Sequence, residues 1–188
     1  MEHKQKISTK RIVLAALMAA LTVVGSGLRV KLPSAVLGTN AFHLGNIFCA
    51  LSGILLGPGL GGLAAGLGSA IYDMFDPIYI SECWITFLMK GAYGLVTGLI
   101  VWSGKNRDNY LKNTLATTAG AIVYAILYLA KNYLKGVWVK GLAPAASALA
   151  LLEKVPPTVF NAIVAIAFAP MLASAIRKAL EKNHLTLN

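Results

Sequence analysis

Apolar residues along the chain gather in six runs, separated by short stretches that are charged or rich in glycine and proline. Runs of this kind are typical of transmembrane helices, since about 20 residues cover a hydrocarbon core of about 30 Å. The pattern predicts six spans, at residues 12–28, 43–56, 58–73, 84–103, 113–134 and 158–176. The second and third are short, so their crossing would depend on the turn between them or on cover by other helices.

The break between the second and third spans lies at Leu56-Gly57-Pro58-Gly59. A single merged helix over residues 43–73 is the alternative. We favour a helical hairpin, because Pro58 lacks a backbone donor and has glycine on both sides.

Composition supports a membrane protein. Hydrophobic residues make up 57% of the 188 residues and charged residues 13%, against about 45–50% and 25% in soluble domains. These values exclude a soluble globule, a disordered chain, a disulfide scaffold and a coiled coil. The expected fold class is therefore an all-α integral membrane protein, with one domain of six transmembrane helices over residues 1–188.

Basic residues predict the orientation. The net charge is +10, which we attribute to cytoplasmic loops rather than to a nucleic-acid partner. Six spans place the two terminal segments and the loop before residue 113 on one side, with ten basic residues against six on the other. Both termini are expected to be cytoplasmic, in a multi-pass protein of the cell membrane. The first run resembles a signal peptide, but Gly25-Ser26-Gly27 is a poor cleavage site, so we expect it to be retained.

Polar residues within or beside the spans gather near the outer surface, whereas the inner halves are almost wholly apolar. This asymmetry predicts a cup open to the outside that binds a small molecule, rather than a channel lined from end to end. Interface anchoring is the competing explanation for the aromatic and lysine residues, and helix capping for the aspartates. The candidate substrate-binding residues are Asn40, His43, Asp73, Glu82, Trp84, Lys90, Tyr93, Tyr128, Lys131, Asn132 and Asn161.

Two outer segments are candidate lids over this cup. Residues 136–157 form a long loop whose apolar part, Ala143–Leu152, is too short to span a membrane. Pro156-Pro157 is expected to end that part before the sixth span. The loop Lys31–Phe42 is the second candidate.

Motifs for catalysis or energy coupling are missing. The nearest approach to a phosphate-binding loop, Gly98 to Asn106, has the wrong spacing and last residue. Three scattered histidines and two isolated cysteines, Cys49 and Cys83, predict no metal site. We expect neither an enzyme nor a cofactor, so uptake would require an ion gradient or a partner.

The sequence resembles the substrate-binding S components of energy-coupling factor (ECF) vitamin transporters, over roughly residues 10–178. The likeness rests on Ala15-xxx-Ala19, on Phe42-His43-Leu44-Gly45-Asn46, and on Leu55 to Gly62 around the Gly-Pro turn. It is closest to the branch for riboflavin, hydroxymethylpyrimidine or pyridoxine-type substrates.

The resemblance implies that the chain binds a water-soluble vitamin or precursor from outside. It also implies partners, namely a membrane coupling protein (the T component) and two cytosolic ATPases, with Ala15 and Ala19 facing the coupling protein. Thiamine is a further candidate ligand. An autonomous ion-coupled transporter or channel is the alternative, in which Lys90 with Asp73 or Glu82 would relay charge.

Overall fold

The apolar runs fold as helices close to the predicted bounds. The computed structural model describes residues 8–104 and 106–183. Its main helices are α1 (Thr9–Gly27), α2 (Gly45–Leu56), α3 (Pro58–Met74), α4 (Cys83–Trp102), α5 (Tyr110–Leu134) and α7 (Val155–Lys182). Four segments are long and apolar enough to cross a membrane, namely Thr9–Gly27, Ile80–Trp102, Tyr110–Val139 and Val155–Lys182. At 12 and 17 residues, α2 and α3 are shorter.

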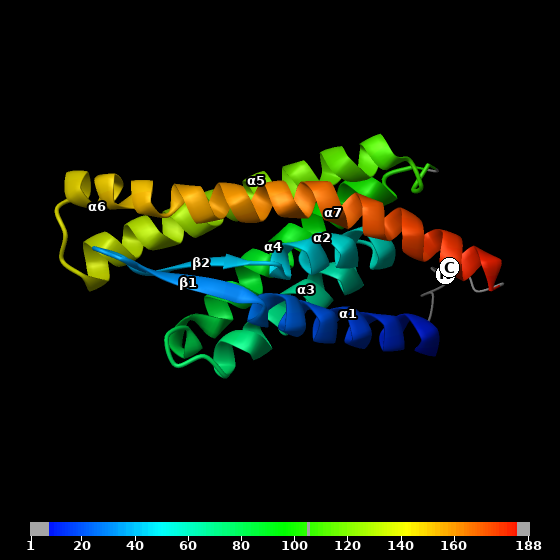
Figure 1. The fold of residues 1–188 in the computed structure, drawn as a ribbon, viewed down its shortest axis with the longest axis horizontal. Coiled ribbons are helices and arrows are strands. Elements are labelled where there is room, and N and C mark those ends of the chain that lie inside the picture. Colours follow the sequence, from blue (N-terminus) through cyan, green and yellow to red (C-terminus); the bar gives the residue numbers. More distant parts are fainter. Residues whose placement is uncertain (1–7, 105, 184–188) are drawn as a thin grey trace, which may run out of the picture.

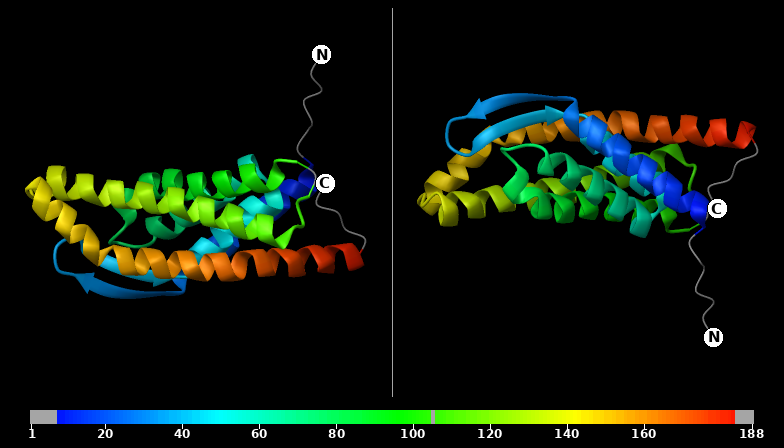
Figure 2. Two further views of the ribbon diagram at one scale, coloured as in Figure 1. Left: turned by 90° about the horizontal axis from the view of Figure 1, so that it is seen from above. Right: turned by 90° about the horizontal axis from the view of Figure 1, so that it is seen from below.

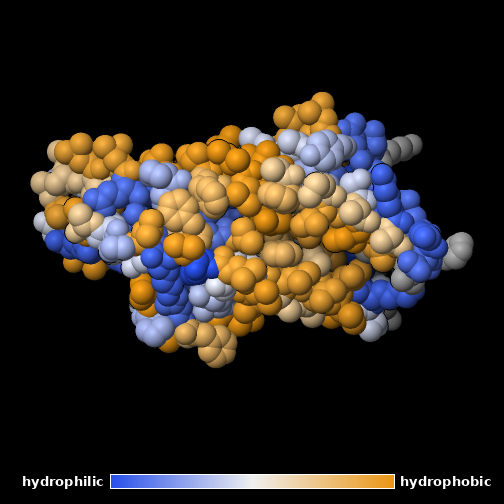
Figure 3. Space-filling view, in the orientation of Figure 1, coloured by the Kyte–Doolittle hydropathy of each residue, from blue (hydrophilic) through white to orange (hydrophobic). Residues whose placement is uncertain are grey.

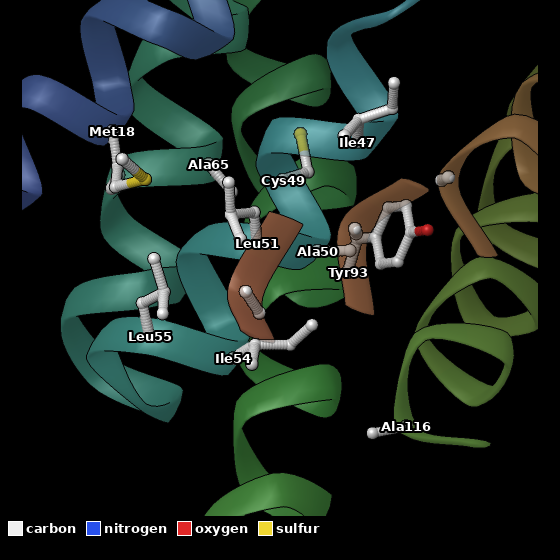
Figure 4. Close-up of a cluster of buried hydrophobic side chains, with 14 of the residues drawn as sticks. Met18, Ile47, Cys49, Ala50, Leu51, Ile54, Leu55, Ala65, Tyr93 and Ala116 are labelled. Carbon is white, nitrogen blue, oxygen red and sulfur yellow. The ribbon is translucent and has the colours of Figure 1, made fainter. Parts of the chain in front are cut away.

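Helix α2 occupies the centre of the bundle (Figure 1). It packs against α1, α3, α4 and α7, and every one of its residues except Phe48 is buried. Figure 4 shows its apolar side chains beside Met18 of α1, Ala65 of α3 and Tyr93 of α4. A helix that is apolar on all sides is expected to be covered on all sides, so α2 serves as the core around which the longer helices are arranged.

Two separate helices stand where a merged helix was the alternative. Helix α2 ends at Leu56 and α3 begins at Pro58. Gly57 has φ +82, a conformation that favours glycine, and a Cβ there would lie 2.9 Å from the Trp102 ring. Pro58 occupies the first turn of α3, where its missing N–H costs nothing. The predicted break is therefore confirmed.

The segment predicted as a loop at Lys31–Phe42 is a β-hairpin, which the all-α prediction missed. Strand β1 (Arg29–Ser34) pairs antiparallel with β2 (Gly38–His43), with Arg29 opposite His43. Figure 2 shows the hairpin as a ribbon lying along the start of α7. The helical fraction is still dominant, and the correction concerns this one element.

The candidate lid at residues 136–157 contains short helices. Outside this lid, a 3-10 turn, η1 (Ile80–Glu82), precedes α4. The π-helical turn η2 (Lys135–Val139) prolongs α5 and is followed by α6 (Pro144–Ala150) and a 3-10 turn, η3 (Leu151–Glu153). Helix α7 then begins at Val155, so Pro156 and Pro157 lie in its first turn. The prolines thus start the last helix rather than separate it from the loop.

The molecule has two distinct ends (Figure 1). The hairpin and α6 lie at one, which we call the hairpin end. The start of α1, the α4–α5 connection and the end of α7 lie at the other, which we call the opposite end. Figure 3 shows hydrophobic residues across the middle of this face and hydrophilic residues beside the hairpin and at the opposite end. Large apolar side chains exposed on the helices, such as Leu88 and Ile126, are what contact with lipid requires.

Candidate functional site

A cavity of about 110 Å³ lies at the hairpin end, between the hairpin and the neighbouring ends of α3, α4, α5 and α7. This is the scale of a single ring, since a cavity of about 150 Å³ accommodates benzene. Eight of the eleven predicted binding residues line it, namely His43, Asp73, Glu82, Lys90, Tyr128, Lys131, Asn132 and Asn161. The structure thus brings these side chains together, and their contact with a ligand stays a prediction.

Three predicted residues do not line the cavity. Trp84 is 62% exposed on the outer face of α4. Tyr93 is fully buried in the core, and its hydroxyl has no hydrogen-bond partner within the described part of the chain. Asn40 belongs to β2 but is absent from the lining. Sequence depth indicated the correct end for these residues, whereas the helical or strand phase decides which way each side chain points.

Several lining residues were not among the predicted set. The hairpin contributes Leu37, Thr39 and Ala41, which could not be assigned while the segment was interpreted as a loop. Arg29 and Tyr124 also line the cavity. Tyr124 could have been found from the sequence, because it lies four residues before the predicted Tyr128 and so shares its face of α5.

Lys90 of α4 is the most deeply placed cation of the cavity, with 4% of its surface exposed. Its Nζ donates to Oδ1 of Asn46 on α2. The same nitrogen lies 4.0 Å from the centroid of the Tyr124 ring, a cation–π contact. Two neighbouring helices therefore hold this ammonium in place.

A ladder of tyrosines runs along one wall. The Tyr124 ring stacks on Tyr93 with centroids 6.0 Å apart and on Tyr128 with centroids 5.8 Å apart. Tyr124 and Tyr128 face the cavity, whereas Tyr93 lies beneath it. Such faces give a planar ring an apolar surface on which to stack.

Arginine and aspartate side chains close the α1–α3 side. Arg29 lies between Asp73, at 3.9 Å, and Asp76, at 3.8 Å, and its guanidinium sits 3.9 Å from the Tyr72 ring centroid. Lys31 contacts Asp76 at 2.6 Å. Burial raises the pKa of the Asp76 carboxyl, but the Lys31 contact, the Ile78 amide and Arg29 outweigh it, so this pKa is below its ordinary value. These contacts attach β1 to the end of α3.

Glu82 closes the α4–α5 side. Its carboxylate accepts hydrogen bonds from Lys131, at 2.5 Å, and from Lys135. Both lysines lie on α5 and its continuation, one turn apart, so η1 is fastened to the end of α5. Lys131 and Lys135 thus balance the charge of the Glu82 carboxylate.

Asn161 of α7 joins the hairpin to the bundle. Its Oδ1 accepts from the His43 backbone N–H at 2.9 Å, and its Nδ2 donates to the Ala41 carbonyl at 3.0 Å. The side-chain amide therefore anchors β2 through its oxygen and one of its two N–H donors. Its contact with a ligand stays a prediction. The sequence indicated a buried polar group here but not its partner.

His43 ends β2 and lines the cavity. Nδ1 accepts the Gly45 N–H at 3.1 Å. The proton of the neutral ring must then be on Nε2, which gives the cavity lining a donor.

The hairpin tip docks on the lid segment at residues 136–157. Nζ of Lys154, which is 1% exposed, donates to the Thr39 carbonyl at 3.0 Å. Ser34 donates to Glu153, and Lys140 donates to the Val36 carbonyl at 2.6 Å. Burial, followed by repulsion from Lys131, lowers the pKa of Lys154 to about 8. The two predicted lid segments thus contact each other over the cavity.

At the opposite end, arginines cap the last turn of α2. Arg11 donates to the Leu56 carbonyl at 2.7 Å, and Arg177 donates to the Ile54 carbonyl at 3.0 Å. Trp102 Nε1 adds a bond to Ile54 O at 3.1 Å. Cations at a helix C-terminus satisfy its free carbonyls and its negative dipole end.

The predicted partner-binding alanines are half-buried. Ala15 and Ala19 pack partly against the core, and the Ala19 carbonyl lies 2.3 Å from the point where a Cβ of Gly68 would be. Part of the predicted docking face is therefore used for contact between α1 and α3. Contact of Ala15 and Ala19 with a coupling protein stays a prediction.

The described residues contain no cluster of three His, Cys, Asp or Glu side chains able to hold a metal ion. Apolar helices around a small charged and aromatic cavity define a membrane protein with a solute-sized cavity at one end.

Comparison with known proteins gives the particular family. The model of the ECF-type riboflavin transporter, S component, matches residues 6–178, and the chain belongs to this family. Its members are components of membrane transporters rather than enzymes. An uncharacterised protein in the gap 3′ region of Pyrococcus woesei is 32% identical over 114 residues, which cover 61% of this chain and 72% of that protein.

Proposed function

We propose that this S component captures a water-soluble vitamin or vitamin precursor from outside the cell in the cavity at the hairpin end. The observation that carries the proposal is the cavity itself, lined by stacked tyrosines and fixed polar groups and covered by the hairpin. Its volume of about 110 Å³ supports a one-ring ligand of the hydroxymethylpyrimidine or pyridoxine type ahead of riboflavin or thiamine.

The proposed topology has six spans, with the hairpin end outside and both termini cytoplasmic. The end of α7 and the α4–α5 connection lie together at the opposite end (Figure 1). Arg177 of α7 donates to the carbonyl of Arg107 in that connection, and Lys112 in the first turn of α5 donates to the Ser103 carbonyl. Clustered basic residues are the signature of the cytoplasmic side. Delivery inward then requires a membrane coupling protein and two cytosolic ATPases, because the chain shows no nucleotide-binding motif of its own.

Calorimetric titration of the purified protein tests the binding step. Hydroxymethylpyrimidine, pyridoxine, riboflavin and thiamine are titrated separately, and saturable binding of one of them is expected. Ala41→Trp, which fills the cavity from β2, should abolish that binding, whereas Val30→Trp, on a β1 residue that is 62% exposed, should not. Failure of all four compounds to bind would contradict the proposal.

Liposomes test the dependence on partners. Vesicles containing this chain alone should bind the vitamin without accumulating it, and accumulation should require the coupling protein, the ATPases and ATP. Accumulation by the chain alone, driven by an ion gradient, would instead establish an autonomous transporter.

A further inference from the structure

Lys90 differs from the other cations around the cavity in lacking a carboxylate partner. Arg29, Lys131 and Lys135 each lie within 4.0 Å of a carboxylate oxygen. Within residues 8–104 and 106–183, no carboxylate oxygen comes this close to Lys90 Nζ. A buried charge without a counter-charge is costly, so its presence at a cavity calls for a functional explanation.

The surroundings of Lys90 fix its position without neutralising it. An ammonium has three donors, and the contact with Asn46 Oδ1 uses one of them. Tyr124 offers its ring face to the charge. Asn46 is 1% exposed, and its Nδ2 has no hydrogen-bond partner among the described residues. The hydrogen bond that its side chain makes is therefore the one that its Oδ1 accepts from Lys90. Donors remain on Nζ for a group inside the cavity.

The cavity lining as a whole has more basic than acidic side chains. Its basic side chains are Arg29, Lys90, Lys131 and Lys135, and its acidic side chains are Asp73 and Glu82. Glu82 already contacts two lysines. A cavity of this charge favours an anionic occupant over a cationic one.

We propose that the ligand is a planar ring that carries an anionic oxygen, and that this oxygen docks on Lys90 Nζ while the ring stacks on Tyr124 and Tyr128. The oxygen belongs to a carboxylate, a phenolate or a deprotonated ring imide. The inference rests on the proposed function, because it takes this cavity as the ligand site. Lys90 then determines specificity, and Asn46 is its positioning residue.

The test uses two probes of nearly equal shape, pyridine-3-carboxylate and pyridine-3-carboxamide, titrated calorimetrically into the purified protein. The carboxylate is expected to bind at least about tenfold more tightly than the amide, the effect of one charge-assisted hydrogen bond. Lys90→Gln should reduce this ratio to about one while leaving the amide affinity unchanged. Lys112→Gln makes the same charge change at the opposite end and should keep the ratio.

Equal binding of the two probes to the wild-type protein, tighter binding of the amide, or no binding of either would overturn the inference, whatever the variant does. A ratio unaffected by Lys90→Gln would also overturn it. Vitamin binding without carboxylate preference would refute only this inference. Carboxylate preference without binding of hydroxymethylpyrimidine, pyridoxine, riboflavin or thiamine would support the inference and exclude these four compounds as the ligand.

Discussion

Removing the Asn161 side-chain amide should loosen the hairpin without unfolding the bundle. Asn161→Ala deletes two hydrogen bonds, one from the His43 N–H and one to the Ala41 carbonyl. Each contributes about 0.5–1.5 kcal/mol net, so the closed position of β2 should lose about 1–3 kcal/mol. The other attachments of the hairpin, at Lys154 and Asp76, remain.

Hydrogen exchange of the His43 amide measures this loss directly, because its N–H donates to Asn161 Oδ1. A loss of about 1–3 kcal/mol corresponds to roughly 5- to 150-fold faster exchange, if the amide exchanges by local opening. Asn132→Ala is the matched control, since that amide donates to Tyr128 O within its own helix rather than to the hairpin. Unchanged exchange in Asn161→Ala, or equal acceleration in Asn132→Ala, would refute the assignment of Asn161 as the hairpin anchor.

Three further predictions concern packing, pH and docking. Gly53→Ala should destabilise the bundle by about 1–3 kcal/mol in thermal unfolding, since its Cβ would lie 2.3 Å from a backbone carbonyl of α4, whereas Gly59→Ala meets no atom within 4 Å and should be nearly neutral. The pKa of Asp76 is lower in the folded than in the unfolded chain, so its carboxylate stabilises the fold at neutral pH and this contribution is lost as the pH falls below 3.8 through the lowered folded value. The difference in unfolding temperature between the wild type and Asp76→Asn should therefore shrink on acidification, and a constant difference would speak against the ion pair. Ala15→Leu and Ala19→Leu should reduce co-purification with the coupling protein while vitamin binding persists, in contrast to an alanine-to-leucine change on the exposed face of α5.

The helices could be predicted from the sequence, because burial in lipid or protein requires long apolar runs. The hairpin was not, because β1 has no buried face. Val30 and Leu32 are 62% and 47% exposed, so alternation of polar and apolar residues does not mark an inner side. Its position depends on distant groups such as Asn161 and Lys154, which a local pattern does not reveal.

The sequence predicted how deep in the membrane the candidate site lies, but not which side chains face it. Polar residues near one end of the spans identified eight of the lining side chains. Trp84 has the same depth but points outward, since only the packing of α4 against α3 and α5 decides which face is covered. The Asn46–Lys90 contact joins residues 44 positions apart and could not be inferred from spacing.

The shortness of α2 constrains the proposed transport step. Twelve residues extend about 18 Å, and the last turn is clasped by Arg11, Trp102 and Arg177. Beneath the cavity the central axis is solid side-chain packing, from Tyr93 down to Ile54. A rigid, permanently open conduit is incompatible with such a floor, so the proposed passage inward would require either that the surrounding helices part from α2 or that the whole protein reorients.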